Sequence, residues 1–209
     1  MSIRSFLEPG SRTATTALIA QLEARTAAEV VISVHRQSSD YRAADLTAGA
    51  LLAFASLLLI LFLPRPFAVE SIPLDVAIAF GVGALIASRA PWLERWLTPR
   101  DVRRRRIHAG ARAAFVDLGV ARTQGRTGVL VYVSLLEHAV EVVTDVGVDP
   151  AALGPAWTEA LAALARSMSP TPDLARFQAG LTALGDVLAR ALPRAHDDRD
   201  ELANEVHAA

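Results

Sequence analysis

The pattern of hydrophobic and polar positions predicts a helix followed by a β-strand in the first part of the chain. The segment EVVISVHR, residues Glu29 to Arg36, is a short apolar run rich in β-branched residues, which is typical of a buried strand. The preceding segment SRTATTALIAQLEARTAAE places Leu18 and Leu22 four residues apart, on one face of a helix.

Further elements are predicted in the second half of the chain. Thr98 as N-cap, Pro99 at the first helical position and Asp101 as capping-box partner predict a helix start. This helix ends near Gly119, and its apolar stripe consists of Ile107, Ala111, Phe115 and Leu118. The segment TGVLVYVSLLEHAVEVVTDVGV then predicts two strands, Val129 to Leu135 and Ala139 to Thr144, joined by a short turn. Two helices follow, Pro155 to Ser167 and Leu174 to Leu192, and the inward positions of the second are Phe177, Leu181, Leu184 and Leu188.

The order of these elements restricts the topology of the sheet. The first two strands are joined through a helix, so they are expected to be parallel, with a right-handed connection. The third strand follows a tight turn and is expected to be antiparallel. The predicted fold class is α/β, an αβα sandwich in which helices cover both faces of a small mixed sheet.

Two long apolar runs interrupt this pattern. Leu46 to Leu63 is 18 residues without a charge, about 27 Å as a helix, which is close to the thickness of a bilayer core. The second run, Ile72 to Ser88, contains Asp75 in its first turn and is either a second span or a buried core helix. Trp92 and Trp96 follow it, as interfacial anchors do, and both runs carry small residues at four-residue spacing, which favours a two-helix transmembrane hairpin.

The hairpin is therefore predicted to be an insertion within the α/β domain. The expected boundaries are 1–42 and 98–194 for the discontinuous domain, 43–97 for the hairpin and 195–209 for an acidic C-terminal tail. The connecting loop contains one arginine, whereas both flanks are rich in arginine. The positive-inside rule then places both flanks in the cytoplasm and the protein in the cell inner (plasma) membrane.

The amino-acid composition excludes several kinds of chemistry. The 209 residues include no cysteine, which excludes disulfides, Fe–S ligation and a thiol nucleophile. All 21 basic residues are arginine, which excludes a P-loop lysine and a Schiff base. Ser134 lacks the glycines of a nucleophile elbow, and the five histidines show no metal-ligand spacing, so no catalytic residue is assigned.

Four segments of the sequence resemble the TPM-domain family, specifically its bacterial membrane branch. These are EARTAAEVVISV, SSDY, RTGVLVYVSLLEHAVEVVTDVGV and the acidic DDRDEL. The resemblance extends from Leu18 to about Val206 apart from the hairpin, and it implies an αβα sandwich, as the element order does. For function it implies repair or assembly of membrane complexes and, from one plant branch, acid phosphatase activity and calcium binding.

One edge of the predicted sheet gathers acidic residues. The strand order places Glu29, Thr127 and Asp145 together, with Arg126 and Asp149 close in sequence. Glu29 and Asp145 are candidate ligands for Ca²⁺ or Mg²⁺, which prefer oxygen donors. The alternative is that Glu29 pairs with Arg126 while Asp145 caps a turn before Gly147.

The opposite edge and the basic run after the second span are further candidate sites. His35, Ser38, Asp40 and Tyr41 are expected near Glu137 and His138, in either a ligand pocket or a junction with the membrane. The residues predicted to contact the membrane surface are Trp92, Trp96, Arg100, Arg103, Arg104, Arg105 and Arg106. Nucleic-acid binding is not expected, because no interleaved aromatics or binding motif accompany these arginines. The terminal DDRDELANE segment is either a solvated tail or a docking segment.

Two functions follow from the sequence. The first is a non-enzymatic interaction or membrane-complex maintenance module whose partners are the lipid bilayer and other membrane proteins. The alternative is a metal-assisted acid phosphatase, with calcium or magnesium as its metal.

Overall fold

The structure is a computed structural model, and it describes residues 6, 8–38, 41–64, 68–194, 201–202 and 206–208. The chain divides into two compact units. Unit 1 comprises Met1–Ser38 and Arg105–Ala209, and unit 2 comprises Ser39–Arg104. Unit 2 therefore interrupts unit 1 after its first strand, close to the position at which the sequence predicts an insertion.

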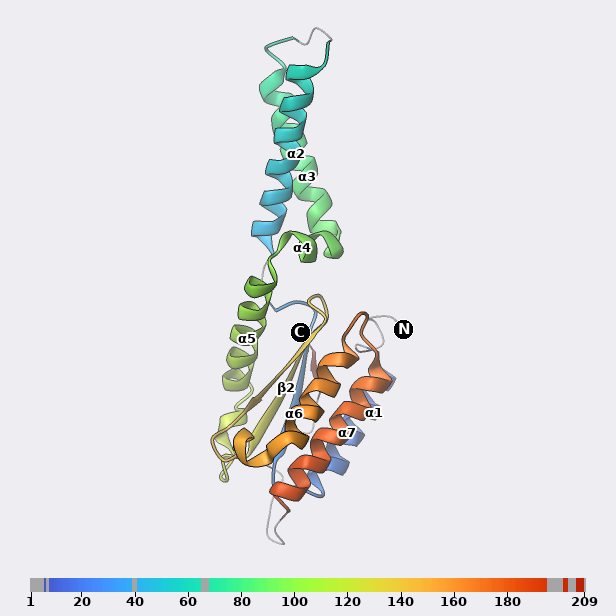
Figure 1. Cartoon of the computed structure of the whole chain (residues 1–209), viewed down its shortest axis with the longest axis vertical. Coiled ribbons are helices and arrows are strands. Elements are labelled where there is room, and N and C mark those ends of the chain that lie inside the picture. The colour runs from blue at the N-terminus through green and yellow to red at the C-terminus, as the bar shows by residue number, and fades with distance from the viewer. Residues whose placement is uncertain are drawn as a thin grey trace. The chain divides into compact units, whose positions relative to one another are not determined.

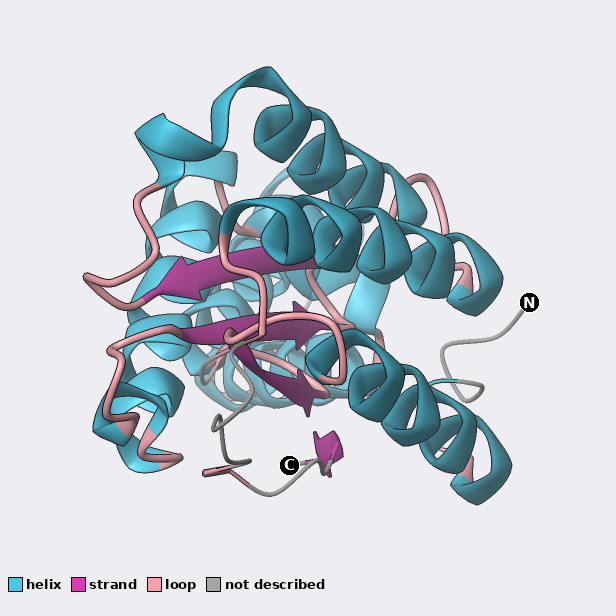
Figure 2. Ribbon diagram, turned by 90° about the horizontal axis from the view of Figure 1, so that it is seen from below, coloured by secondary structure: helices cyan, strands magenta, loops and turns pink. Residues whose placement is uncertain are grey.

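Unit 1 is built on a four-stranded mixed sheet with the order β3-β2-β1-β4. The strands are β1 (Glu29–His35), β2 (Gly128–Ser134), β3 (Ala139–Thr144) and β4 (Val206–Ala208). β1 is parallel to β2 from Glu29↔Gly128 to His35↔Ser134, and β2 is antiparallel to β3. These pairings are the predicted ones, and the one opposed strand direction is visible in Figure 2.

Helices cover both faces of this sheet. α1 (Pro9–Glu23), α6 (Pro150–Ser167) and α7 (Leu174–Ala191) lie on one side, and α5 (Arg100–Asp117) lies on the other (Figure 1). A short 3-10 helix, η2 (Val120–Arg122), follows α5. The predicted inward residues of α7, Phe177, Leu181, Leu184 and Leu188, are all buried.

Each face of the sheet has its own hydrophobic core, as alternation along the strands requires. Val30, Ile32 and Val34 of β1 contribute to the larger core beneath α1, α6 and α7. Val31 of β1 contributes to the smaller core, which contains Leu130 and Tyr132 of β2 and Ile107, Ala111 and Ala114 of α5.

Two features of unit 1 and the start of α5 differ in detail from the sequence prediction. β4 is a fourth strand, parallel to β1, in the segment predicted to be an acidic tail. α6 includes an additional turn from Pro150; Gly154, with a φ of 69°, is not helical and separates this turn from the longer helical segment, which begins at Pro155 as predicted. α5 begins at Arg100, and the carbonyl oxygen of Pro99 accepts the first turn's hydrogen bond from the Arg103 amide.

Unit 2 contains two long apolar helices, α2 (Arg42–Phe62) and α3 (Ile72–Arg89), and the short α4 (Pro91–Leu97). α2 and α3 are long and apolar enough to cross a membrane, with mean hydropathies of 2.1 and 1.6. The two helices are in close contact at Gly49 and Gly83. A Cβ atom added at either glycine would lie 2.8 Å from a carbonyl oxygen of the other helix, so only glycine permits this packing.

Candidate functional site

Polar side chains gather at both ends of the sheet face that α5 covers. This face carries Glu29, Val31, Ser33 and His35 from β1, because alternate residues of a strand share a face. In-register neighbours on β2 are Gly128, Leu130, Tyr132 and Ser134. The apolar middle of the face thus separates an acidic edge, near the start of both parallel strands, from a second polar group near their carboxyl ends.

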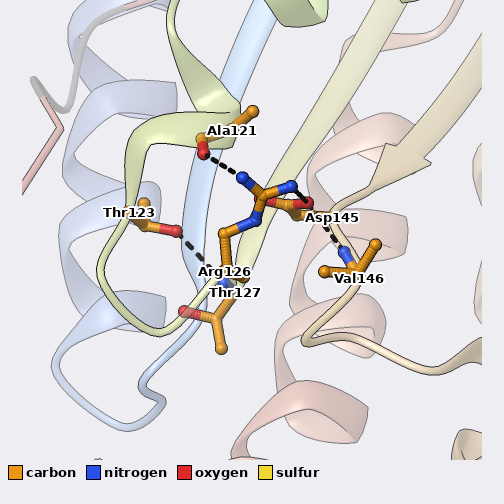
Figure 3. A network of polar contacts seen from close by, with 6 residues as sticks. All are labelled: Ala121, Thr123, Arg126, Thr127, Asp145 and Val146. Carbon is orange, nitrogen blue, oxygen red and sulfur yellow. Dashed lines mark hydrogen bonds and ion pairs between the residues drawn. The ribbon is translucent and has the colours of Figure 1, made fainter.

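At the acidic edge, Arg126 and Asp145 form an ion pair. Arg126 Nη2 lies 3.0 Å from Asp145 Oδ1, and Arg126 Nη1 donates to the carbonyl oxygen of Ala121 at 3.2 Å (Figure 3). The Asp145 side chain is only 3% exposed, whereas that of Arg126 is 52% exposed. Asp145 Oδ1 also accepts a hydrogen bond from the Val146 amide at 2.8 Å. One oxygen of this buried carboxylate therefore has two donors.

The structure pairs Arg126 with Asp145, whereas one of the two interpretations of the sequence paired Arg126 with Glu29. The Asp145 amide donates to the Gly128 carbonyl oxygen, which extends the β2–β3 ladder by one residue and brings Asp145 within reach of Arg126. Glu29 is also buried, and its Oε1 accepts the Glu201 amide at 3.4 Å. The turn expected at Gly147 is present, since the Gly147 amide donates to the Arg126 carbonyl oxygen.

The two other residues predicted at this edge have structural roles. Thr127 Oγ1 donates to the Ala27 carbonyl oxygen at 2.7 Å and thereby links β2 to the loop before β1. Asp149 is the N-cap of α6 and accepts the Ala151 amide at 2.9 Å. Within the described residues, no group of three or more His, Cys, Asp or Glu side chains is arranged to hold a metal ion.

The second polar group surrounds His35 at the carboxyl end of β1. The His35 ring stacks on Tyr132, with ring centroids 4.6 Å apart, and its Nε2 lies 2.8 Å from Ser33 Oγ. Burial lowers the pKa of the His35 imidazole, although the nearby Glu137 carboxylate opposes this shift. Burial also raises the pKa of the Tyr132 phenol. His35 and Tyr132 are thus both held toward their uncharged forms.

Glu137 connects this group to the turn after β2. Its Oε2 accepts a short hydrogen bond from the Ser134 hydroxyl, and its Oε1 accepts the Ser38 amide at 3.0 Å. Ser134 is fully buried and Glu137 is 6% exposed. The arrangement fixes the β2–β3 turn against the segment after β1, because both carboxylate oxygens are used.

Three of the residues predicted at this edge are brought together by contacts of the described residues, namely His35, Ser38 and Glu137. His138 Nδ1 lies 2.9 Å from the Pro170 carbonyl oxygen. Asp40 lies outside the described residues, and Tyr41 belongs to unit 2. Most of the DDRDELANE segment also lies outside the described residues.

The predicted membrane-contact residues lie in α4 and the first part of α5. Trp92 and Trp96 are highly exposed, at 70% and 77%. Arg100, Arg104 and Arg105 are exposed, whereas Arg103 and Arg106 are partly buried. Sequence reasoning identified these residues but missed the helix that presents the tryptophans, α4, whose seven residues are too few for a helical period to stand out.

These features define a mixed α/β domain interrupted by a pair of apolar helices. No family model and no curated protein matches the chain. A similar solved structure is the NMR structure of BA42 protein from the psychrophilic bacterium Bizionia argentinensis, which has 15% sequence identity and a TM-score of 0.59. The match covers 98% of this chain and 96% of that chain. At this level of identity, the similarity concerns the fold alone.

Proposed function

We propose that this protein is a membrane-anchored domain of the TPM type that acts as a non-enzymatic interaction or membrane-complex maintenance module. In this proposal α2 and α3 form a transmembrane hairpin in the inner (plasma) membrane, and unit 1 lies on the cytoplasmic side. Its partners are the lipid bilayer and other membrane proteins.

The observation that carries the proposal is the exposed apolar surface of α2 and α3. Only 11% of the most apolar window of each helix is buried. Large side chains such as Phe54 and Leu85 are 60% and 56% exposed. A contiguous apolar surface of this kind is costly in water and favourable in lipid. The close contact at Gly49 and Gly83 supports the same interpretation, because small residues are what allow helices to pack within a bilayer.

The candidate sites support an interaction module over the metal-assisted phosphatase. Oδ1 of Asp145 is engaged by the Arg126 guanidinium and the Val146 amide. Ser134 and Glu137 bond to each other and are buried, so neither is presented to a substrate. Turnover of a generic phosphate ester that required Asp145 and calcium or magnesium would contradict this choice.

Cysteine labelling tests the anchoring and the orientation together. The chain has no cysteine, so single cysteines at Ala68, before α3, and at Ala175, on α7, need no other change. Both positions are exposed. We expect a membrane-impermeant maleimide to label the Ala68→Cys variant in intact cells and the Ala175→Cys variant only after permeabilisation. The opposite pattern would reverse the orientation, and release of the chain by alkaline carbonate would contradict the anchoring.

A further inference from the structure

Unit 2 contains a small hollow lined by two tryptophans and two arginines. Trp92, Arg95 and Trp96 of α4 and Arg103 of α5 line this open hollow of about 250 Å³. Trp92 and Trp96 lie four residues apart, on one face of α4. Both charged lining residues are cationic, so the hollow is suited to an anion.

Arg103 differs from the arginines that follow it in the basic run. Its Nε atom is shielded from solvent and has no hydrogen-bond partner among the described residues. Arg104 and Arg105 are exposed instead. Phosphate oxygens match the guanidinium geometry well. Arg103 lines the hollow, whereas Arg104 and Arg105 do not, so a phosphate group held there can accept hydrogen bonds from the Arg103 guanidinium.

An apolar groove adjoins this hollow. It measures about 360 Å³ and shares Trp96 with the hollow. Its lining includes Leu52 and Ala55 of α2, Gly83 and Ile86 of α3, and Leu93 and Trp96 of α4. A cationic hollow that shares a lining tryptophan with an apolar groove fits a ligand with a phosphate at one end and a hydrocarbon chain at the other.

We propose that unit 2 binds one anionic phospholipid at a defined site. The phosphate lies between the guanidinium groups of Arg95 and Arg103, the tryptophan rings border the headgroup, and one acyl chain occupies the groove beside Ala55. This site rests on the proposed function, because it requires a chain that resides in a membrane. It goes further in assigning one specific lipid site, in addition to general contact between the basic run and the membrane surface.

Native mass spectrometry of the full chain in non-ionic detergent tests the headgroup half of the site. Equal amounts of phosphatidylglycerol and phosphatidylcholine with identical acyl chains are the probes. We expect the wild type to retain phosphatidylglycerol preferentially and Arg103→Gln to reduce this retention about tenfold, since a charged hydrogen bond is lost. Arg104→Gln removes the same charge one residue away and should change retention less than about twofold. Equal losses in the two variants would overturn the site.

A second pair of variants tests the acyl half. Ala55→Phe fills the groove, whereas Ala50→Phe adds the same ring to an exposed position of α2 outside it. We expect only Ala55→Phe to weaken retention. Equal retention of phosphatidylglycerol by the two variants would contradict binding of a phospholipid at this site. Displacement of the lipid by glycerol phosphate at a similar concentration would contradict it as well. Carbonate extraction tests the membrane anchoring separately. A chain that resists extraction but shows no preference for phosphatidylglycerol would overturn the lipid site and leave the proposed anchoring in place.

Discussion

Replacing Arg126 with glutamine tests how strongly the acidic edge holds unit 1 together. The substitution removes the ion pair and leaves the Asp145 carboxylate, 3% exposed, with the Val146 amide as its one remaining described hydrogen-bond donor. Breaking a fully buried pair costs about 3–5 kcal/mol, whereas an exposed pair contributes about 0–1 kcal/mol. Because Arg126 itself is half exposed, water can approach the vacated side of the carboxylate, and we expect a loss of about 1–2 kcal/mol.

The chain provides a matched control for this prediction. Arg25 and Asp186 form a pair of nearly the same length, 2.9 Å, but both side chains are 49% exposed. Arg25→Gln should therefore cost less than about 0.5 kcal/mol.

The assay is urea unfolding of the full chain in detergent, in a Trp92→Phe, Trp96→Phe background. The remaining tryptophan, Trp157, is buried in the larger core and reports on unit 1. Equal losses for Arg126→Gln and Arg25→Gln would show that burial of the carboxylate does not set the energy of the pair, and would refute the reasoning.

Two further predictions concern protonation and metal ions. Burial lowers the pKa of His35 in the folded chain. Between that lowered pKa and about 6.5, the unfolded chain therefore binds more protons than the folded chain. The stability that neutral His35 contributes is fully present above about pH 6.5 and is lost as the pH falls through the lowered pKa. His35→Gln should flatten this decline between pH 7.5 and 5.5 in urea titrations, and an unchanged slope would assign it to other groups. Because Arg126 already pairs with Asp145, millimolar calcium after chelation should leave the melting temperature of the wild type unchanged. A cation bound at Glu29 and Asp145 at about 100 times its dissociation constant would instead stabilise the chain by roughly 2.7 kcal/mol.

The hydrophobic pattern predicted the main elements because their burial is either continuous, as in a fully buried strand, or periodic, as on one face of a helix. β1 is buried over six successive residues, and α7 buries a stripe at helical spacing, so both stand out in the sequence. β4 has only three residues and is stabilised by pairing with Ile32–Val34 of β1, a contact that no local pattern reveals. Short elements held by distant partners were therefore missed.

For each candidate site, the sequence predicted which residues lie near one another but not which of them pair. Strand order alone places Glu29 and Asp145 near Arg126, but the choice of partner depends on the extension of the β2–β3 ladder by one residue. The stacking of His35 on Tyr132 likewise depends on the exact register of β1 and β2. Register arises from the whole sheet, and a one-residue shift would move these side chains to the opposite face.

The short pairing of β4 with β1 also covers part of an edge of the sheet. β1 has β2 along one side, and on the other side an open strand edge would invite pairing with a second molecule. β4 occupies this edge at Ile32–Val34, and the Glu23 carboxylate accepts the Val30 amide just before it. The edge is thus protected by two independent parts of the same chain, α1 and the final strand. Removing Val206–Ala208, or blocking their access with a bulky fusion, would leave a hydrophobic strand edge exposed and favour aggregation.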